Sequence, residues 1–214
     1  MSSFVFPAWT NRLRVLVGVA VGGGLAYVVV LAAYGLSPKT LAVGYSPEQP
    51  VPYSHALHVG KLGLDCRYCH ATVERSANAA LPSANICMNC HKTVRAASAA
   101  LVPVRASAAG DVPVPWVRVH HLPDFVYFDH SAHVRRGVGC VSCHGRIDKM
   151  ERVAQAEPLS MGWCLECHRA PEERLRPAEF ITSMDWVPDS PMLGARLRDE
   201  HRIQPPTDCW GCHR

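Results

Sequence analysis

The residues Tyr127–Gly145 read YFDHSAHVRRGVGCVSCHG and contain two histidines three positions apart, a short basic spacer and then Cys-x-x-Cys-His. A Cys-x-x-Cys-His pentapeptide is the attachment sequence of a c-type haem, in which both thiols bond to the haem vinyl groups and the histidine ligates the iron. The upstream histidines, His130 and His133, offer imidazoles for the opposite side of one or two irons. This stretch therefore predicts a haem site that supplies most of its own iron ligands.

The pentapeptide occurs five times and uses every cysteine of the 214-residue chain. Its cysteines are Cys66 with Cys69, Cys87 with Cys90, Cys140 with Cys143, Cys164 with Cys167, and Cys209 with Cys212. The histidines that follow them are His70, His91, His144, His168 and His213. A disulfide framework would explain an even number of cysteines and zinc would explain paired thiols, but neither requires histidine at one fixed offset. The pattern therefore predicts five covalently bound haem c groups, each with a proximal histidine.

Seven further histidines are available for the distal side of the irons. A His-x-x-His interval places both imidazoles nearly on one face of a helical turn, so one pair can serve two haems. The predicted distal ligands are His55 and His130 for the haems of their own repeats, His58 and His133 for neighbouring haems, and His120 for the fifth haem. His121 and His201 are predicted to be surface or packed core residues and not ligands. Methionine is an alternative distal ligand that raises the potential of a haem, and the candidates are Met88, Met161 and Met184.

The chain also contains an internal repeat. Tyr53–His70, YSHALHVGKLGLDCRYCH, matches Phe128–His144, FDHSAHVRRGVGCVSCH, and a second pentapeptide follows each of them. The predicted division is a cytoplasmic head (1–14), a transmembrane anchor (15–36), a linker (37–52), a first dihaem unit (53–92), an Ala/Val/Pro-rich insertion (93–115), a second dihaem unit (116–168) and a C-terminal segment with the fifth haem (169–214).

The anchor is predicted from Val15–Leu36, which has no charged side chain. A helix rises about 1.5 Å per residue, so this run spans the roughly 30 Å hydrocarbon layer of a membrane. A cleaved signal peptide would have a shorter apolar region. Arg12 and Arg14 flank its N-terminal end, which places that end in the cytoplasm. We therefore expect a single-pass protein of the bacterial cytoplasmic membrane, with its haem domain on the extracytoplasmic side.

Composition predicts the fold class. Aromatic residues make up only 7% of the chain and prolines number 17, so we expect a mostly irregular and α-helical multihaem cytochrome c, with little β structure and haems as its core. The formal charge of +4 would be reversed by the propionates of five haems, and a nucleic-acid partner is not indicated. No catalytic triad, phosphate loop or paired-carboxylate site is visible. The predicted chemistry is therefore one-electron transfer along a row of haems.

Both the repeat unit and the whole chain resemble known families. The His-x-x-His unit with its haem motif is similar to the small multihaem cytochromes of the c3/c7 type. The whole chain resembles the pentahaem cytochrome c subunits of bacterial alternative complex III, through the N-terminal anchor, YSHALHVGKLGLDCRYCH, VHHLPDFVYFDHSAHV, MGWCLECHR and the terminal CWGCHR. The resemblance is weakest over residues 93–115, and it favours His120 over His121 as a ligand.

This resemblance implies an electron-transfer subunit that is not an enzyme by itself. Its partners would be an iron–sulfur subunit, membrane subunits that resemble polysulfide reductase and oxidise menaquinol, and a monohaem cytochrome c, with electrons passing to a periplasmic carrier or a terminal oxidase. Two alternatives stay open. A membrane-anchored quinol dehydrogenase that feeds a periplasmic reductase would isolate alone, whereas a multihaem reductase would need a five-coordinate, high-spin haem.

Overall fold

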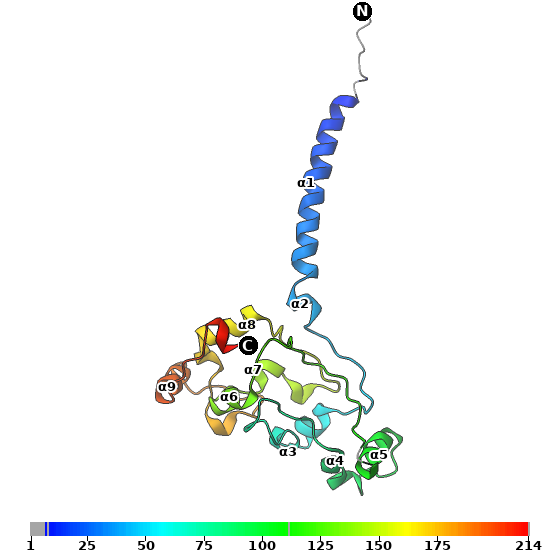
Figure 1. The fold of residues 1–214 in the computed structure, drawn as a ribbon, viewed down its shortest axis with the longest axis vertical. Coiled ribbons are helices and arrows are strands. Elements are labelled where there is room, and N and C mark those ends of the chain that lie inside the picture. The colour runs from blue at the N-terminus through cyan, green and yellow to red at the C-terminus, as the bar shows by residue number, and fades with distance from the viewer. Residues whose placement is uncertain (1–6, 8, 111, 214) are drawn as a thin grey trace, which may run out of the picture. The chain divides into compact units, whose positions relative to one another are not determined.

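One apolar helix dominates the N-terminal part of the computed structural model, which describes residues 7, 9–110 and 112–213. Helix α1 spans Thr10–Gly35 and a short helix, α2, spans Pro38–Leu41 (Figure 1). The segment Arg12–Gly35 is long and apolar enough to cross a membrane, and none of it is buried within the structure. Half of the predicted head, residues 1–6 and 8, lies outside the described residues. Ala42 ends this first compact unit, and a second unit begins at Val43.

The second unit is made of short helices joined by irregular segments, as predicted. Its α-helices are α3 (Cys66–Cys69), α4 (Ala84–His91), α5 (Val102–Gly110), α6 (His130–Arg135), α7 (Val141–His144), α8 (Met161–Arg169) and α9 (Leu193–Glu200). A π-helical turn covers Ala56–Lys61, and 3-10 turns cover Ala99–Leu101, Ile147–Lys149, Pro171–Arg174, Ala178–Phe180 and Cys209–Gly211. Within the described residues, β structure amounts to two isolated bridges, Val126 with His213 and Val138 with Leu175. The mostly helical and irregular fold class is confirmed.

The apolar core of this unit is small. Its buried cluster consists of Leu175, Leu193, Leu197 and Ile203, with Val138 and Trp186 packed against it. Helix α9 contributes two of these leucines, and Arg198 on the same helix pairs with Glu172 to hold α9 against the turn Pro171–Arg174. This cluster lies beside the haem motifs and does not run through them. Side-chain packing alone therefore leaves most of the unit without a hydrophobic centre, which a set of porphyrins would supply.

The two repeats pack against each other reciprocally. In the first repeat, the Ala56 N–H donates to the Met150 carbonyl, just beyond the third haem motif. In the second repeat, the His130 N–H donates to the Ala77 carbonyl, just beyond the first motif. Each His-x-x-His turn is therefore held by the loop that follows the haem motif of the other half, an arrangement we call the clasp.

Helix α5 belongs to the predicted insertion and packs on α4, which carries the second haem motif. Its Val104 is buried, and Arg105 donates to the carbonyls of Ala96 and Ser98. Figure 1 shows α4 and α5 at one end of the second unit and α9 at the other, with α3 and α7 between them and α8 above α7, near the C-terminus. The haem motifs are thus distributed along the length of this unit.

Candidate functional site: a row of haem motifs

Every Cys-x-x-Cys-His motif forms a helical turn. In the first, third and fifth motifs the histidine N–H donates to the carbonyl of the first cysteine, at 2.8, 3.0 and 2.8 Å, and the second and fourth motifs lie in α4 and α8. Neighbouring side chains cap these turns, because Asp65 accepts from the Arg67 N–H and Asp208 accepts from the Gly211 N–H. A helical turn brings both thiols and the imidazole to one side of the backbone, as covalent haem attachment requires.

The two His-x-x-His pairs have the same local geometry. Tyr53 lies edge-on to His55 and stacks on His58, with ring centroids 4.8 and 4.4 Å apart. In the second repeat Phe128 lies edge-on to His130 and stacks on His133, at 4.7 Å in both cases. The aromatic residue two positions before each pair therefore fixes both imidazoles at once. The internal repeat seen in the sequence is a repeat of ligand geometry.

Three of these histidines face the proximal histidine of a haem motif. The ring centroids of His58 and His91 are 6.2 Å apart, those of His130 and His144 are 6.4 Å apart, and those of His133 and His168 are 6.1 Å apart. Two imidazoles that share one metal through bonds of about 2 Å have ring centroids roughly 6 Å apart. These separations fit the predicted assignments of His58 and His133 to neighbouring haems and of His130 to its own.

The fourth predicted pair, His55 with His70, is less closely defined. His70 influences the imidazole of His55, but their rings form none of the ring contacts seen for the other three pairs. Burial, followed by the neighbouring His70 and His58, lowers the pKa of His55 to about 4. His55 is therefore neutral at physiological pH, which metal ligation requires.

Backbone carbonyls orient most of the candidate ligands. The Nδ1 atom lies 2.7–2.9 Å from a backbone carbonyl oxygen in six of them and 3.4 Å from one in His213. The six are His58, His70, His91, His130, His133 and His168. This contact selects the tautomer with hydrogen on Nδ1 and leaves Nε2 free to bind a metal. The residues therefore fit haem ligation.

Other kinds of site fit the chain less well. All ten cysteines are in the described part of the chain, and all have free thiols. Among the described residues no three or more His, Cys, Asp or Glu side chains gather into a metal site of their own. A haem iron needs only two ligands from the protein, since the porphyrin supplies the other four. The disulfide and zinc alternatives therefore find no support in this arrangement.

Thiols from different motifs approach one another in a definite order. The Cys66 thiol lies within hydrogen-bonding reach of Cys140, and this contact raises the pKa of Cys66. Burial, and then the neighbouring Cys87 thiol, raise the pKa of Cys69. These contacts place the first motif between the second and the third.

The remaining thiols show which motifs come next to the third one. Burial raises the pKa of Cys143 to about 12, with Cys167 and Cys164 as the next causes. Burial also raises the pKa of Cys164, with Cys212 as the next cause. Numbered by their order in the sequence, the motifs therefore lie next to one another in space in the order second, first, third, fourth and fifth. The first four of these follow α4, α3, α7 and α8 in Figure 1.

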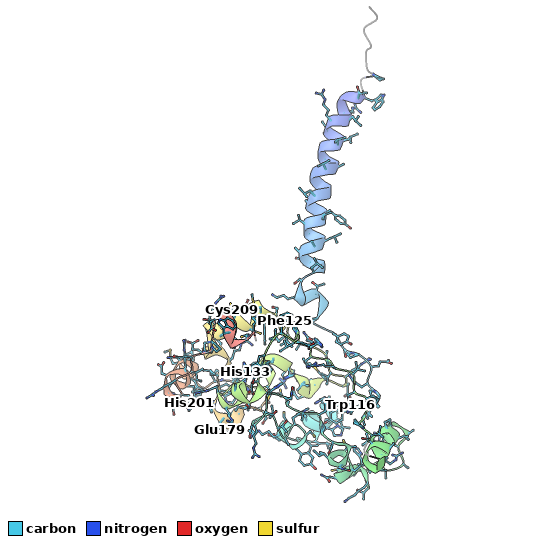
Figure 2. The ribbon with its side chains drawn as sticks, viewed as in Figure 1. Trp116, Phe125, His133, Glu179, His201 and Cys209 are labelled. Carbon is cyan, nitrogen blue, oxygen red and sulfur yellow. The ribbon has the colours of Figure 1, made fainter. Side chains whose placement is uncertain are left out.

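The segment Phe125–Tyr127 holds the fifth motif, a role that sequence reasoning did not foresee. The Tyr127 N–H donates to the Cys212 carbonyl at 2.7 Å, the Phe125 carbonyl lies 3.4 Å from His213 Nδ1, and the Phe125 ring stacks on the His213 ring at 5.8 Å. Figure 2 shows Phe125 close to Cys209. The dense aromatic run before the second repeat was the available signal, but it did not reveal which motif it would meet.

The structure brings His120 to the third motif. The ring centroids of His120 and His144 are 4.6 Å apart with an angle of 80° between the rings, whereas within the described residues His213 forms no ring contact with a histidine. The assignment of His120 to the fifth haem stays a prediction, and this arrangement does not favour it. His121 and His201 are exposed, and Figure 2 shows His201 at the edge of the unit.

Comparison with known proteins accounts for this combination of repeated haem motifs and a thin apolar core. The family described as "Cytochrome c7 and related cytochrome c" matches residues 51–107 and 126–214. This chain belongs to that family. A c7-type cytochrome carries haem c bound covalently through cysteines, so the chain is a multihaem cytochrome c that transfers electrons.

A curated relative of this c7-type chain is the "Menaquinone reductase, multiheme cytochrome c subunit" of Nitratidesulfovibrio vulgaris. The two are 35% identical over 102 residues, which cover 45% of this chain and 46% of that protein. The c7-type chain thus spans less than half the length of this relative.

Proposed function

We propose that this chain is the membrane-anchored pentahaem cytochrome subunit of a menaquinol-oxidising complex of the alternative complex III type. In this role it relays electrons from an iron–sulfur subunit to a periplasmic cytochrome, a soluble carrier or a terminal oxidase. The single observation that carries the proposal is the continuous row of neighbouring haem motifs. A row of redox groups in one chain is suited to moving single electrons over a distance between two partners.

The chain's own residues define and insulate this row. Each haem iron would accept and release one electron, and its potential would depend on its axial ligands and surroundings. His58, His130 and His133 would hold three irons from the distal side, each facing a proximal histidine. Backbone carbonyls and stacked aromatic rings hold these imidazoles in place. Two histidines for one iron would leave no position for a substrate at these sites, which supports electron transfer as the chemistry of the chain.

Partners are proposed from three features. Helix α1 supports a single-pass anchor, with Arg12 and Arg14 favouring a cytoplasmic N-terminus. The name of the relative from N. vulgaris links such a cytochrome to menaquinone chemistry in a multisubunit protein. The sequence resemblance to alternative complex III adds polysulfide-reductase-like membrane subunits, an iron–sulfur subunit and a monohaem cytochrome c.

A second candidate is the same relay running in the opposite direction, toward menaquinone. The name of the N. vulgaris relative, a menaquinone reductase subunit, favours it. Because electron transfer between haems is reversible, the potentials of the end haems and the nature of the partners decide the direction. Both candidates predict a multisubunit complex, whereas a stand-alone quinol dehydrogenase would be isolated as a single chain.

The test is purification from native membranes in mild detergent, followed by identification of the co-purifying subunits. We expect an iron–sulfur subunit and polytopic membrane subunits, together with covalently bound haem equal to five per copy of this chain. Faster menaquinol oxidation than menaquinone reduction by the complex supports the first candidate, and the reverse supports the second. A chain that isolates alone and accepts electrons directly from menaquinol analogues would contradict both.

A further inference from the structure

Arg176 is a buried arginine that lies against the start of the third haem motif. Only 8% of the residue is exposed. Its backbone N–H donates to the Gly137 carbonyl at 2.9 Å, and the Cys140 N–H donates to the Ile181 carbonyl at 3.1 Å. These two hydrogen bonds hold the loop that begins at Arg176 along the residues that lead into the motif.

Several contacts fix the guanidinium of Arg176 in place. Its Nη1 atom donates to the carbonyls of Phe180 and Ser183, at 3.3 and 2.8 Å. The guanidinium carbon also lies over the Trp186 ring, 5.0 Å from the ring centroid. A β-carbon at Gly139 would overlap the guanidinium. The glycine immediately before the motif therefore leaves the space that the positive charge occupies.

The charge of Arg176 is not balanced by a carboxylate. Among the residues that the structure describes, Arg176 takes part in no ion pair, and its Nε atom is buried without a hydrogen-bond partner. By contrast Arg67, another arginine whose charge reaches Cys140, is paired with two carboxylates. Burial lowers the pKa of Arg176, yet a guanidinium stays charged in proteins. A buried cation without a partner is costly, so a role in the neighbouring site is expected of it.

We propose that Arg176 raises the reduction potential of the third haem through the positive charge that it holds beside Cys140. The inference rests on the proposed haem at this motif and goes beyond it. The charge reaches the attachment site, because contact with Cys66 lowers the pKa of the Cys140 thiol and the guanidinium of Arg176 lowers it further. A ferric haem carries one more positive charge than a ferrous haem. A fixed cation nearby therefore disfavours the ferric state and favours uptake of the electron.

The place of the third motif in the row gives this charge a consequence for electron transfer. The motif is the middle one of five, so an electron that travels from one end of the row to the other must pass its haem. Two histidine ligands give a haem a lower potential than histidine with methionine does. A low potential in the middle of the row would be an uphill step for the electron, and a fixed cation makes that step smaller.

The test compares three variants of the full-length haem protein. Arg176→Met removes the charge and keeps a long side chain, Arg176→Lys keeps the charge, and Arg196→Met removes the charge of an exposed arginine on α9. In potentiometric titrations we expect Arg176→Met to lower one haem potential by about 59 mV, which is a tenfold change for a one-electron couple. A unit charge acting over about 10 Å at an effective dielectric constant of about 20 gives a change of this order. Arg176→Lys should keep most of the wild-type potential, and Arg196→Met should change nothing.

A Cys140→Ser/Cys143→Ser background shows which haem responds. Loss of the Arg176→Met shift in that background supports the inference, and persistence of the shift would overturn it. Unchanged or raised potentials in an Arg176→Met protein with full covalent haem content and an unchanged ferric EPR spectrum would also overturn it, because Arg176 would then only hold the loop in place.

Two further points keep the test decisive. If Arg176→Met takes up less haem than wild type, Arg176→Gln replaces it in the comparison, since its amide is neutral and can donate to the same carbonyls. Free thiols at the third motif of the wild-type protein, detected by mass spectrometry, would contradict the proposed haem itself and with it the inference. Unchanged potentials in a fully loaded variant would contradict the role of Arg176 alone.

Discussion

His58 and His91 face each other with ring centroids 6.2 Å apart, although His58 precedes the first haem motif and His91 closes the second. The equivalent residues of the other repeat, His133 and His168, are 6.1 Å apart. The second imidazole of each His-x-x-His pair therefore faces the proximal histidine of a haem motif that comes later in the chain. Ligation shared in this way would tie the two haems of each half together.

Replacing His58 by methionine should raise the potential of the haem on Cys87 and Cys90, because a thioether ligand favours the ferrous state. The measurement is a potentiometric titration of the full set of haems. His201→Met, at an exposed histidine, is the control. In a Cys87→Ser/Cys90→Ser background the shift should vanish, and its persistence there would mean that His58 serves another haem.

Removing whole haem sites tests the order of the row. Cys87→Ser/Cys90→Ser deletes an end site, so we expect only the haem of the first motif to change its potential. Cys140→Ser/Cys143→Ser deletes an internal site with neighbours on both sides, so two haems should shift. Covalent haem content should fall by one in each variant. Shifts in two or more potentials after loss of the second motif would contradict the order.

Gly60→Ala should weaken the clasp between the repeats. A β-carbon at residue 60 would overlap the carbonyl oxygen of Asp148, which is backbone and cannot move aside alone. Forcing extra volume into such a contact costs about 1–3 kcal/mol, so the midpoint of chemical denaturation should fall. Gly162→Ala, where the added carbon meets no atom within 4 Å, is the control and should leave the midpoint unchanged or raise it. Equal midpoints for wild type and Gly60→Ala would show that the clasp is not as close as described.

Truncation tests the anchor. A chain that begins at Val43, exported by a cleavable signal peptide, retains the whole second compact unit. We expect it to attach haem, to keep the haem spectrum of the full chain, and to move from the membrane to the soluble fraction. A truncated protein that stays with the membrane would locate the attachment in the haem domain or in its partners.

Local sequence patterns predicted the haem motifs, the apolar helix and the irregular fold, because each depends on residues close together in the chain. The helical turns that carry the Cys-x-x-Cys-His motifs are of this kind. What local patterns could not predict depends on long-range packing. Neither the contact of Phe125 with His213 nor that of His120 with His144 follows from spacing, because the partners lie far apart in sequence and their meeting depends on how the two halves pack.

The clasp has a consequence for the way the protein is made. The first His-x-x-His turn takes its final place only when it meets residues near Met150, which are synthesised well after it. The first haem motif therefore stays in an open chain until the second half is made. Haem attachment can act on it during that interval, while its cysteines are still accessible, and closure of the two halves then buries the finished site.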